Sequence, residues 1–202
     1  MHRRRRVVVA AAVVIGMAAA VAGCAPQGRS LSAEFPSDAS AGYVSQDGTV
    51  VQVPAQDRGE PVSFTGKTEH GDNVSSKDFT GRVYVVNFWY AACGPCRVEA
   101  PMLEEAWQTH KSDDVGFLGV NIYDQAPTAL AFAKDYGITY PSVIDVNDGD
   151  VKLAFAAATP IQATPTTLVI DTQGRVAARI IGQLESAALL SSLIQSVLDE
   201  AP

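Results

Sequence analysis

One segment limits the possible folds of this chain more than any other: an apolar run at residues 83–88 that is followed closely by two cysteines. A nearly continuous apolar run of this length is typical of a strand that is buried on both faces. Residues 95–110 have a helical pattern, and Pro95 suits a first helical turn, where its missing N–H costs no hydrogen bond. Cys93 and Cys96 are therefore predicted to lie where a buried strand passes into a helix.

Strand and helix patterns alternate through the C-terminal part of the chain. We expect an α/β fold, with a mixed central sheet and helices on both of its faces, in a single domain at residues 61–202. Turn-forming side chains at residues 171–174 lie between two apolar runs, which indicates an antiparallel hairpin. The expected strands are residues 62–65, 83–88, 115–122, 142–146, 166–170 and 176–181, and the expected helices are residues 75–78 (a short turn), 95–110, 127–136 and 185–199.

The N-terminus has the pattern of an export signal. Four arginines at residues 3–6 precede an apolar stretch at residues 7–22 that is too short for a comfortable membrane span. The stretch ends in Val-Ala-Gly-Cys, which resembles the lipobox of bacterial lipoproteins. The resemblance implies removal of residues 1–23 and a lipid on Cys24, which would anchor the chain at the outer face of a membrane. An uncleaved signal anchor with an incidental cysteine is the alternative, and either one places the domain outside the cytoplasm, where disulfides persist.

The segment after the signal, residues 24–60, is rich in Ser, Ala, Gly, Gln and Asp and has little apolar periodicity. We expect a flexible tether there, with at most one short strand at residues 49–53. The chain has a formal net charge of −7, and loss of the four signal arginines would leave −11. An acidic chain without basic clusters is a poor candidate for binding nucleic acid, so we expect no such partner.

The chain has three cysteines, an odd number that needs an explanation in an exported protein. If Cys24 carries a lipid, Cys93 and Cys96 remain as one isolated pair, which excludes a framework of several structural disulfides. Half of a zinc site is an alternative for such a pair, but the chain has no further thiols, and His70 and His110 stand alone. We therefore expect neither a metal nor another cofactor.

The position of the pair predicts thiol–disulfide exchange. The thiolate is the nucleophile in this reaction, and backbone N–H groups at a helix N-terminus stabilise its charge. We expect Cys93 to be exposed, with a lowered pKa, and Cys96 to be shielded one turn further along. Cys93 would then attack a substrate disulfide, and Cys96 would resolve the mixed disulfide. An inert structural disulfide is the alternative, although a place at a strand-to-helix junction argues against it.

The segment at residues 87–101, NFWYAACGPCRVEAP, resembles the active-site segment of the thioredoxin superfamily, most closely that of its membrane-anchored TlpA/ResA/CcmG branch. The resemblance continues through residues 163–167 (ATPTT) and 171–174 (DTQG) and covers the whole predicted domain. It implies a thioredoxin-like three-layer fold and a cis peptide bond before Pro165, beside the cysteines; an ordinary trans proline entering a strand is the alternative. It also implies that the backbone at Thr164 pairs with an extended substrate chain. The residues expected to bind substrate are Trp89, Gly94, Pro95, Thr164 and Pro165.

Two further positions resemble the same branch, and one departs from the family. The branch tends to carry Asn at the position of Asn87 and Glu at the position of Glu99. Residues three apart share a helix face, which brings Glu99 towards Cys96, where a carboxylate could accept the thiol proton. The alternative is an acidic residue that only complements the helix dipole. The family usually has Trp immediately before the first cysteine, and here Ala92 replaces it, which leaves the substrate preference open.

Together these features predict an extracytoplasmic, lipid-anchored disulfide reductase that acts on exported proteins. The resemblance implies apocytochrome c as a substrate and a membrane electron donor of the CcdA/DsbD type as a partner. A disulfide oxidase that uses the same two cysteines is the second enzymatic hypothesis. A copper-binding assembly factor on the same fold is a third, but such proteins use CxxxC and a distant histidine, and no histidine follows His110.

Overall fold

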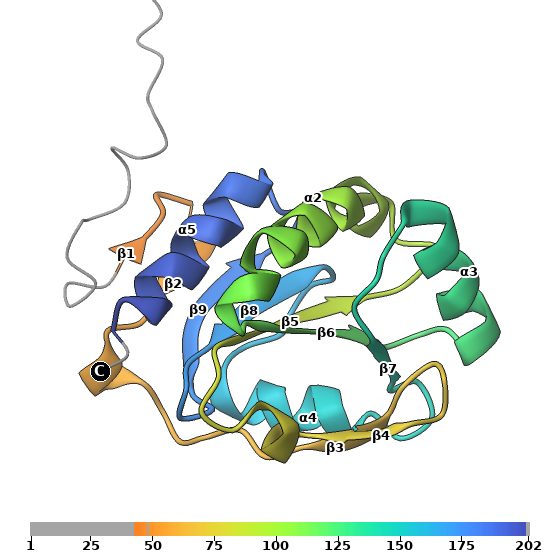
Figure 1. Cartoon of the computed structure of the whole chain (residues 1–202), viewed down its shortest axis with the longest axis horizontal. Coiled ribbons are helices and arrows are strands. Elements are labelled where there is room, and N and C mark those ends of the chain that lie inside the picture. Colours follow the sequence, from red (N-terminus) through yellow and green to blue (C-terminus); the bar gives the residue numbers. More distant parts are fainter. Residues whose placement is uncertain (1–42, 48, 201–202) are drawn as a thin grey trace, which may run out of the picture. The chain divides into compact units, whose positions relative to one another are not determined.

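The computed structural model describes residues 43–47 and 49–200, and Figure 1 shows the arrangement of their helices and strands. The expected signal peptide, Cys24 and the tether up to residue 42 lie outside the described residues. The main sheet has seven strands, in the order β1 (Tyr43–Val44), β2 (Val50–Gln52), β9 (Val176–Ile181), β8 (Thr166–Ile170), β5 (Tyr84–Trp89), β6 (Gly116–Asn121) and β7 (Ser142–Ile144). A second sheet pairs β3 (Thr65–Lys67) with β4 (Asn73–Ser75). The helices are α2 (Gly94–His110), α3 (Ala126–Tyr136), α4 (Asp150–Ala158) and α5 (Ala187–Leu198), with short 3-10 turns η3 (Ala55–Asp57), η4 (Ser76–Phe79) and η5 (Lys111–Asp113).

Strand β5 is buried on both faces, as its apolar run predicts. Its side chains alternate between the two faces of the sheet. Val85 belongs to the core cluster that contains Leu103 of α2 and Leu190 of α5. Val86 and Phe88 belong to the opposite cluster, which contains Phe155 of α4. Figure 1 shows the same layers, with α2 and α5 over one face of the sheet and α4 over the other, which confirms the predicted three-layer α/β fold.

The strand register brings three chain segments to one edge of the sheet. β5 runs parallel to β6, with Trp89 opposite Asn121, and antiparallel to β8, with Phe88 opposite Thr166. The carboxyl ends of β5 and β6 and the start of β8 therefore lie at the same end of the sheet, which forms this edge. The two cysteines follow β5 at this edge, between the other two segments.

Strands β1 and β2 lie within the expected tether and join the main sheet, so the domain begins before the expected residue 61; β2 corresponds to the short strand expected at residues 49–53. β2 pairs antiparallel with β9, and Val50 is buried in the core. The side chain of Arg58 is 1% exposed and forms ion pairs with Asp171 at 3.1 Å and with Glu200 at 2.6 Å. A three-residue strand has little periodicity of its own, and its pairing partner lies more than 120 residues further along the chain.

Several other elements differ from the prediction, among them β1 and β4, which were not expected. The strand expected at residues 62–65 is wrong except at Thr65, and the N–H of Val62 instead bonds the carbonyl oxygen of Gly174. Helix α4 was not predicted at all; the carboxylate of Asp145 accepts hydrogen bonds from two N–H groups at its start. In the described part of the chain, no helix is long and apolar enough to cross a bilayer.

Candidate active site at the start of helix α2

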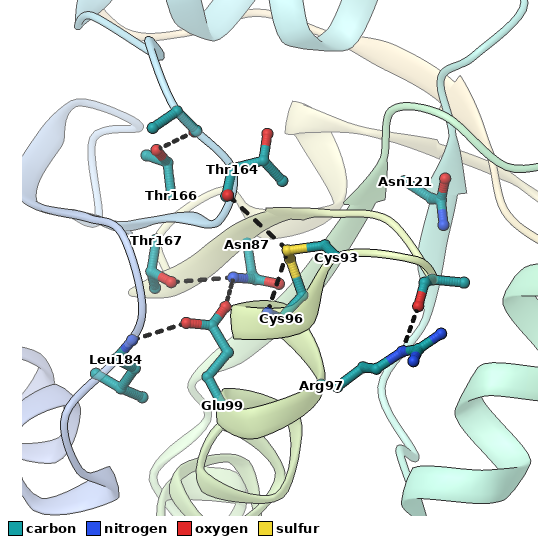
Figure 2. The surroundings of a disulfide bond; sticks show 12 residues. Asn87, Cys93, Cys96, Arg97, Glu99, Asn121, Thr164, Thr166, Thr167 and Leu184 are labelled. Carbon is teal, nitrogen blue, oxygen red and sulfur yellow. Dashed lines mark hydrogen bonds between the residues drawn. A yellow bond between two sulfur atoms is a disulfide. The ribbon is translucent and has the colours of Figure 1, made fainter.

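Cys93 and Cys96 form a disulfide at the N-terminus of α2 (Figure 2). Cys93 is the N-cap residue of the helix, and Cys96 lies in its first turn, so their Cα atoms are 5.2 Å apart. The backbone N–H of Cys96 donates to Cys93 Sγ at 3.2 Å. The same N–H would stabilise a thiolate on Cys93 once the disulfide is reduced, because the free N–H groups of a helix N-terminus favour negative charge.

The prediction that Cys93 is exposed is wrong for the disulfide form. Cys93 is 3% exposed and Cys96 is 2% exposed, so burial does not distinguish them. The covering segment enters β8: Cys93 Sγ lies 3.8 Å from the carbonyl oxygen of Thr164, and the Thr164–Pro165 peptide bond is cis, as expected. In the disulfide form the sulfur has no proton to donate, so the two atoms are only in van der Waals contact. In the reduced protein the thiol of Cys93 can donate an S–H···O hydrogen bond to this oxygen.

The expected substrate-binding residues lie in three places, one of which is the segment of Thr164 and Pro165 that covers Cys93. Gly94 and Pro95 are exposed beside the disulfide, where a partner protein can reach them. Trp89 is 6% exposed; its indole N–H donates to Ser142 Oγ at 3.2 Å, and its ring lies 4.4 Å from that of Phe132. Trp89 therefore packs behind the disulfide and supports the site from inside the domain.

Glu99 is fully buried, and both of its carboxylate oxygens accept hydrogen bonds. The donors are Asn87 Nδ2 and the backbone N–H of Leu184, each at 2.8 Å, and Asn87 Nδ2 also donates to Thr167 Oγ1 at 3.0 Å (Figure 2). Burial raises the pKa of Glu99 to about 7, although the two hydrogen bonds act in the opposite direction. In the described residues no hydrogen bond joins Glu99 to Cys96. A carboxyl with a pKa near 7 can exchange a proton at neutral pH, as an acid–base group must.

A small cavity of about 10 Å³ lies directly behind Cys96. Tyr140 and Glu69 line it, together with Asn87 and Trp89. Burial is the main cause that raises the pKa of Tyr140, and the charge of Glu99 adds to it. Sequence reasoning missed both residues. Tyr140 precedes β7 and Glu69 lies in the β3–β4 turn, and local patterns connect neither position to the cysteines.

Sequence reasoning also missed the loop between β6 and α3. The carboxylate of Asp124 accepts hydrogen bonds from the N–H of Ala91 at 2.6 Å and from Asn121 Nδ2 at 3.0 Å. This loop is therefore bonded to the segment that carries the cysteines. A signal was present in the sequence: the strands predicted at residues 83–88 and 115–122 are joined through a helix, a connection typical of parallel strands, whose carboxyl ends lie at the same end of the sheet.

A disulfide that caps a helix at the edge of a mixed sheet, beside a cis-proline segment, defines a thioredoxin-like thiol–disulfide oxidoreductase. Exchange needs one attacking sulfur and a second one close enough to close the ring, and Cys93 and Cys96 provide both. Among the residues that the structure describes, no three His, Cys, Asp or Glu side chains are grouped so that they could hold a metal ion.

The chain belongs to the redoxin family, whose model matches residues 35–193. It is 27% identical over 127 residues to the thiol-disulfide oxidoreductase ResA of Bacillus subtilis, which covers 63% of this chain and 68% of the relative. It is 33% identical over 107 residues to ResA of Geobacillus kaustophilus, which covers 53% of this chain and 59% of the relative, less than two thirds of that protein.

Solved structures agree with this assignment. A DsbF homologue from Corynebacterium diphtheriae is 30% identical, with a TM-score of 0.65, over 76% of this chain and 96% of that one. A secreted thiol-disulfide isomerase from Corynebacterium glutamicum is 26% identical, with a TM-score of 0.69, over 78% of this chain and 97% of that one.

Proposed function

We propose that this protein is an extracytoplasmic reductase that transfers two electrons from the dithiol of Cys93 and Cys96 to disulfides in exported proteins. The observation that supports this direction is the weak stabilisation of negative charge at Cys93 Sγ. In the described residues its one hydrogen-bond donor is the N–H of Cys96, and a carbonyl oxygen of Thr164 lies on another side. The guanidinium of Arg97 is directed elsewhere, because its Nε donates to the carbonyl oxygen of Ala91 at 2.8 Å (Figure 2).

The electrostatics connect this observation to the direction of electron flow. A strongly oxidising pair owes its potential to a reduced form that the protein stabilises, chiefly through a very acidic thiol. Few donors and a nearby carbonyl oxygen leave the reduced form of this pair comparatively unstable. A dithiol of that kind gives its electrons readily to another disulfide.

The reaction proceeds in two exchanges. The thiolate of Cys93 attacks one sulfur of the substrate disulfide, and the other substrate sulfur leaves as a thiolate. The backbone at Thr164 pairs with the extended substrate chain while the mixed disulfide exists. Cys96 then gives its proton to Glu99 and attacks Cys93 Sγ, and the second substrate sulfur leaves as a thiolate. The protein is left with the disulfide seen in the structure. The substrate has gained two electrons, and its two thiolates take up two protons, one that Cys93 released on ionisation and one that Glu99 received from Cys96.

The cellular setting is part of the same proposal. We place the protein at the outer face of a membrane, held by a lipid on Cys24, because residues 1–23 have the pattern of an export signal and one of the similar solved structures is of a secreted protein. A membrane electron donor of the CcdA/DsbD type restores the dithiol after each turnover. Apocytochrome c is one substrate of suitable chemistry, because its haem-binding cysteines must be reduced before haem attachment.

The reduction potential of the pair tests the direction. The protein is equilibrated with dithiothreitol or glutathione buffers, and the free thiols are trapped by rapid alkylation. We expect a value near that of thioredoxin, about −270 mV. A value near −120 mV would identify the protein as an oxidase instead.

Trapping of partners tests the exchange mechanism itself. A C96S variant retains the attacking thiol but cannot resolve the intermediate, so it should accumulate mixed disulfides with exported proteins through Cys93. C93S is the matched control and should trap far less. Equal trapping by the two variants would contradict the assigned roles of the two thiols.

A further inference from the structure

An exposed aromatic side chain lies close to the disulfide. Among the described residues, four large apolar side chains are exposed, and of these Tyr123 is the most exposed, at 73%, and alone is aromatic. An exposed ring of this size contributes little to folding, because its apolar surface stays in water. Tyrosine is enriched at binding interfaces, because its ring is apolar while its hydroxyl can still hydrogen-bond.

The backbone that carries Tyr123 is held firmly. Asn121, which is fully buried, accepts hydrogen bonds at Oδ1 from the N–H of Tyr123 at 3.0 Å and from the N–H of Asp124 at 2.7 Å. Asp124 in turn accepts the N–H of Ala91, so the loop is fastened to the segment that leads into Cys93. A ring on a fixed loop loses less conformational entropy on binding than a ring on a mobile one.

The ring also contacts the active-site segment directly. Its centroid lies 5.6 Å from that of Tyr90, whose carbonyl oxygen accepts the N–H of Cys93 at 3.2 Å. Because β5 lies between β8 and β6, Cys93 lies between the segment of Thr164 and the loop of Tyr123. Figure 2 shows Thr164 and Asn121 on opposite sides of Cys93.

The residue that precedes the first cysteine contributes almost no contact surface. Ala92 is exposed and offers a single methyl group. Tyr123, with Tyr90 behind it, supplies an aromatic surface at a different position, on the β6 side of the disulfide. A substrate chain that pairs with Thr164 and passes over Cys93 would continue towards this ring.

We propose that Tyr123 determines substrate specificity by contacting an aromatic or large aliphatic side chain next to the target cysteine. The inference rests on the proposed exchange with polypeptide disulfides. Neighbouring strands are about 4.8 Å apart and an extended chain advances about 3.3 Å per residue, so the contacted side chain lies one or two residues from the target cysteine.

Two synthetic peptides test this inference. They share one cysteine and differ in having Phe or Ser at the positions one and two residues from it, and each is used as its disulfide-linked dimer. For the wild-type protein kcat/KM should be about 3- to 10-fold higher with the Phe peptide, the range expected from one aromatic contact. Y123S should reduce this ratio to about 1 by slowing the Phe peptide alone, and Y123F should keep it.

Controls separate recognition from chemistry. L153S removes another exposed apolar side chain, on α4, and should leave the ratio unchanged. Reduction of a small aromatic-free disulfide should be equal in wild type and Y123S. The inference is overturned if Y123S keeps the Phe preference, or if it slows every substrate equally. The same peptides are also given as free thiols to the oxidised protein. If the protein is an oxidase and not a reductase, it will oxidise these peptides, and the ratio of kcat/KM for the Phe and Ser peptides will still report on Tyr123.

Discussion

At the scale of single residues, the surroundings of Glu99 fit both of its protonation states. Its two oxygens face the N–H donors of Asn87 and Leu184, which suits a carboxylate. A protonated carboxyl must instead donate one hydrogen bond. If the amide of Asn87 turns over, its oxygen faces Glu99 and Thr167, where it can accept that proton and the hydroxyl hydrogen of Thr167. Proton transfer at Glu99 therefore needs only one amide rotation, and Gln at this position can mimic the protonated form.

The kinetic consequence is a pH-dependent resolving step. Burial raises the pKa of Glu99 to about 7, and the base form exists above that pH, so the resolution rate should rise as the pH increases through 7. We expect E99Q to lose this inflection and to resolve the mixed disulfide about 10- to 100-fold more slowly. Stopped-flow measurement of a preformed mixed disulfide checks this. E105Q, an exposed position on the same helix, is the control, and an unchanged E99Q profile would leave only the dipole role.

The same raised pKa predicts how stability depends on pH. The folded protein holds the Glu99 proton up to about pH 7, whereas an unfolded glutamate releases it near 4.5. The folded state therefore binds more protons between these values, and its free energy of unfolding should fall by about 3 kcal/mol as the pH rises across this window. E99Q should lack this component. Denaturant unfolding of both proteins at pH 4.5, 6 and 8 measures the difference, and parallel pH curves would disprove it.

At the scale of elements, strand β2 has the clearest structural role outside the site. A chain that begins at residue 55 lacks β1 and β2, which removes the buried Val50 and exposes the edge of β9. We expect it to be about 3 kcal/mol less stable than a chain that begins at residue 43, and to associate with itself through the free edge. Denaturant unfolding and sedimentation compare the two. Equal stability would show that residues 43–54 are a linker after all.

Elements with a strong pattern of their own were predictable from the sequence. The buried strand at β5, helices α2, α3 and α5, and the β8–β9 hairpin all appear close to their expected positions. Strand β2 matches the short strand expected at residues 49–53, but its place in the main sheet was not predicted, because three residues carry little pattern. Helix α4 was not predicted, because Asp148 and Gly149 suggest a turn just where it begins. The carboxylate of Asp145 accepts the N–H of Val151 at the start of α4, a contact between residues six apart that the apolar pattern does not reveal.

The site shows the same division. The positions of Cys93, Cys96 and Glu99 follow from local spacing, and the sequence predicted them. The cover over Cys93 comes from a segment about seventy residues further along the chain, so its burial could not be predicted locally. The hydrogen bond from the N–H of Ala91 to Asp124 could not be predicted locally either, because it depends on how β5 and β6 pair.

At the scale of the whole molecule, attachment to a membrane remains a prediction from the sequence. C24S should abolish labelling with radioactive palmitate and release the protein into the medium or the soluble fraction, because the thiol that would carry the lipid is gone. Its in vitro activity on a model disulfide should not change, since Cys24 takes no part in exchange. Retention of C24S in the membrane would favour the uncleaved signal anchor.

The ion pairs of Arg58 have a practical consequence for handling the molecule. They hold Glu200, just beyond the last helix, beside the segment that follows β2. Tyr43, where the chain enters the sheet, pairs with Gln52 at one end of β2. The other end of β2 is the one near the cis-proline segment, because Thr49 bonds to Ile181 there. Both ends of the described chain thus lie at the end of the sheet opposite the disulfide. Affinity tags, dyes or a solid support can be attached at either end without covering the disulfide. Immobilised protein should therefore retain its full capacity to capture partners.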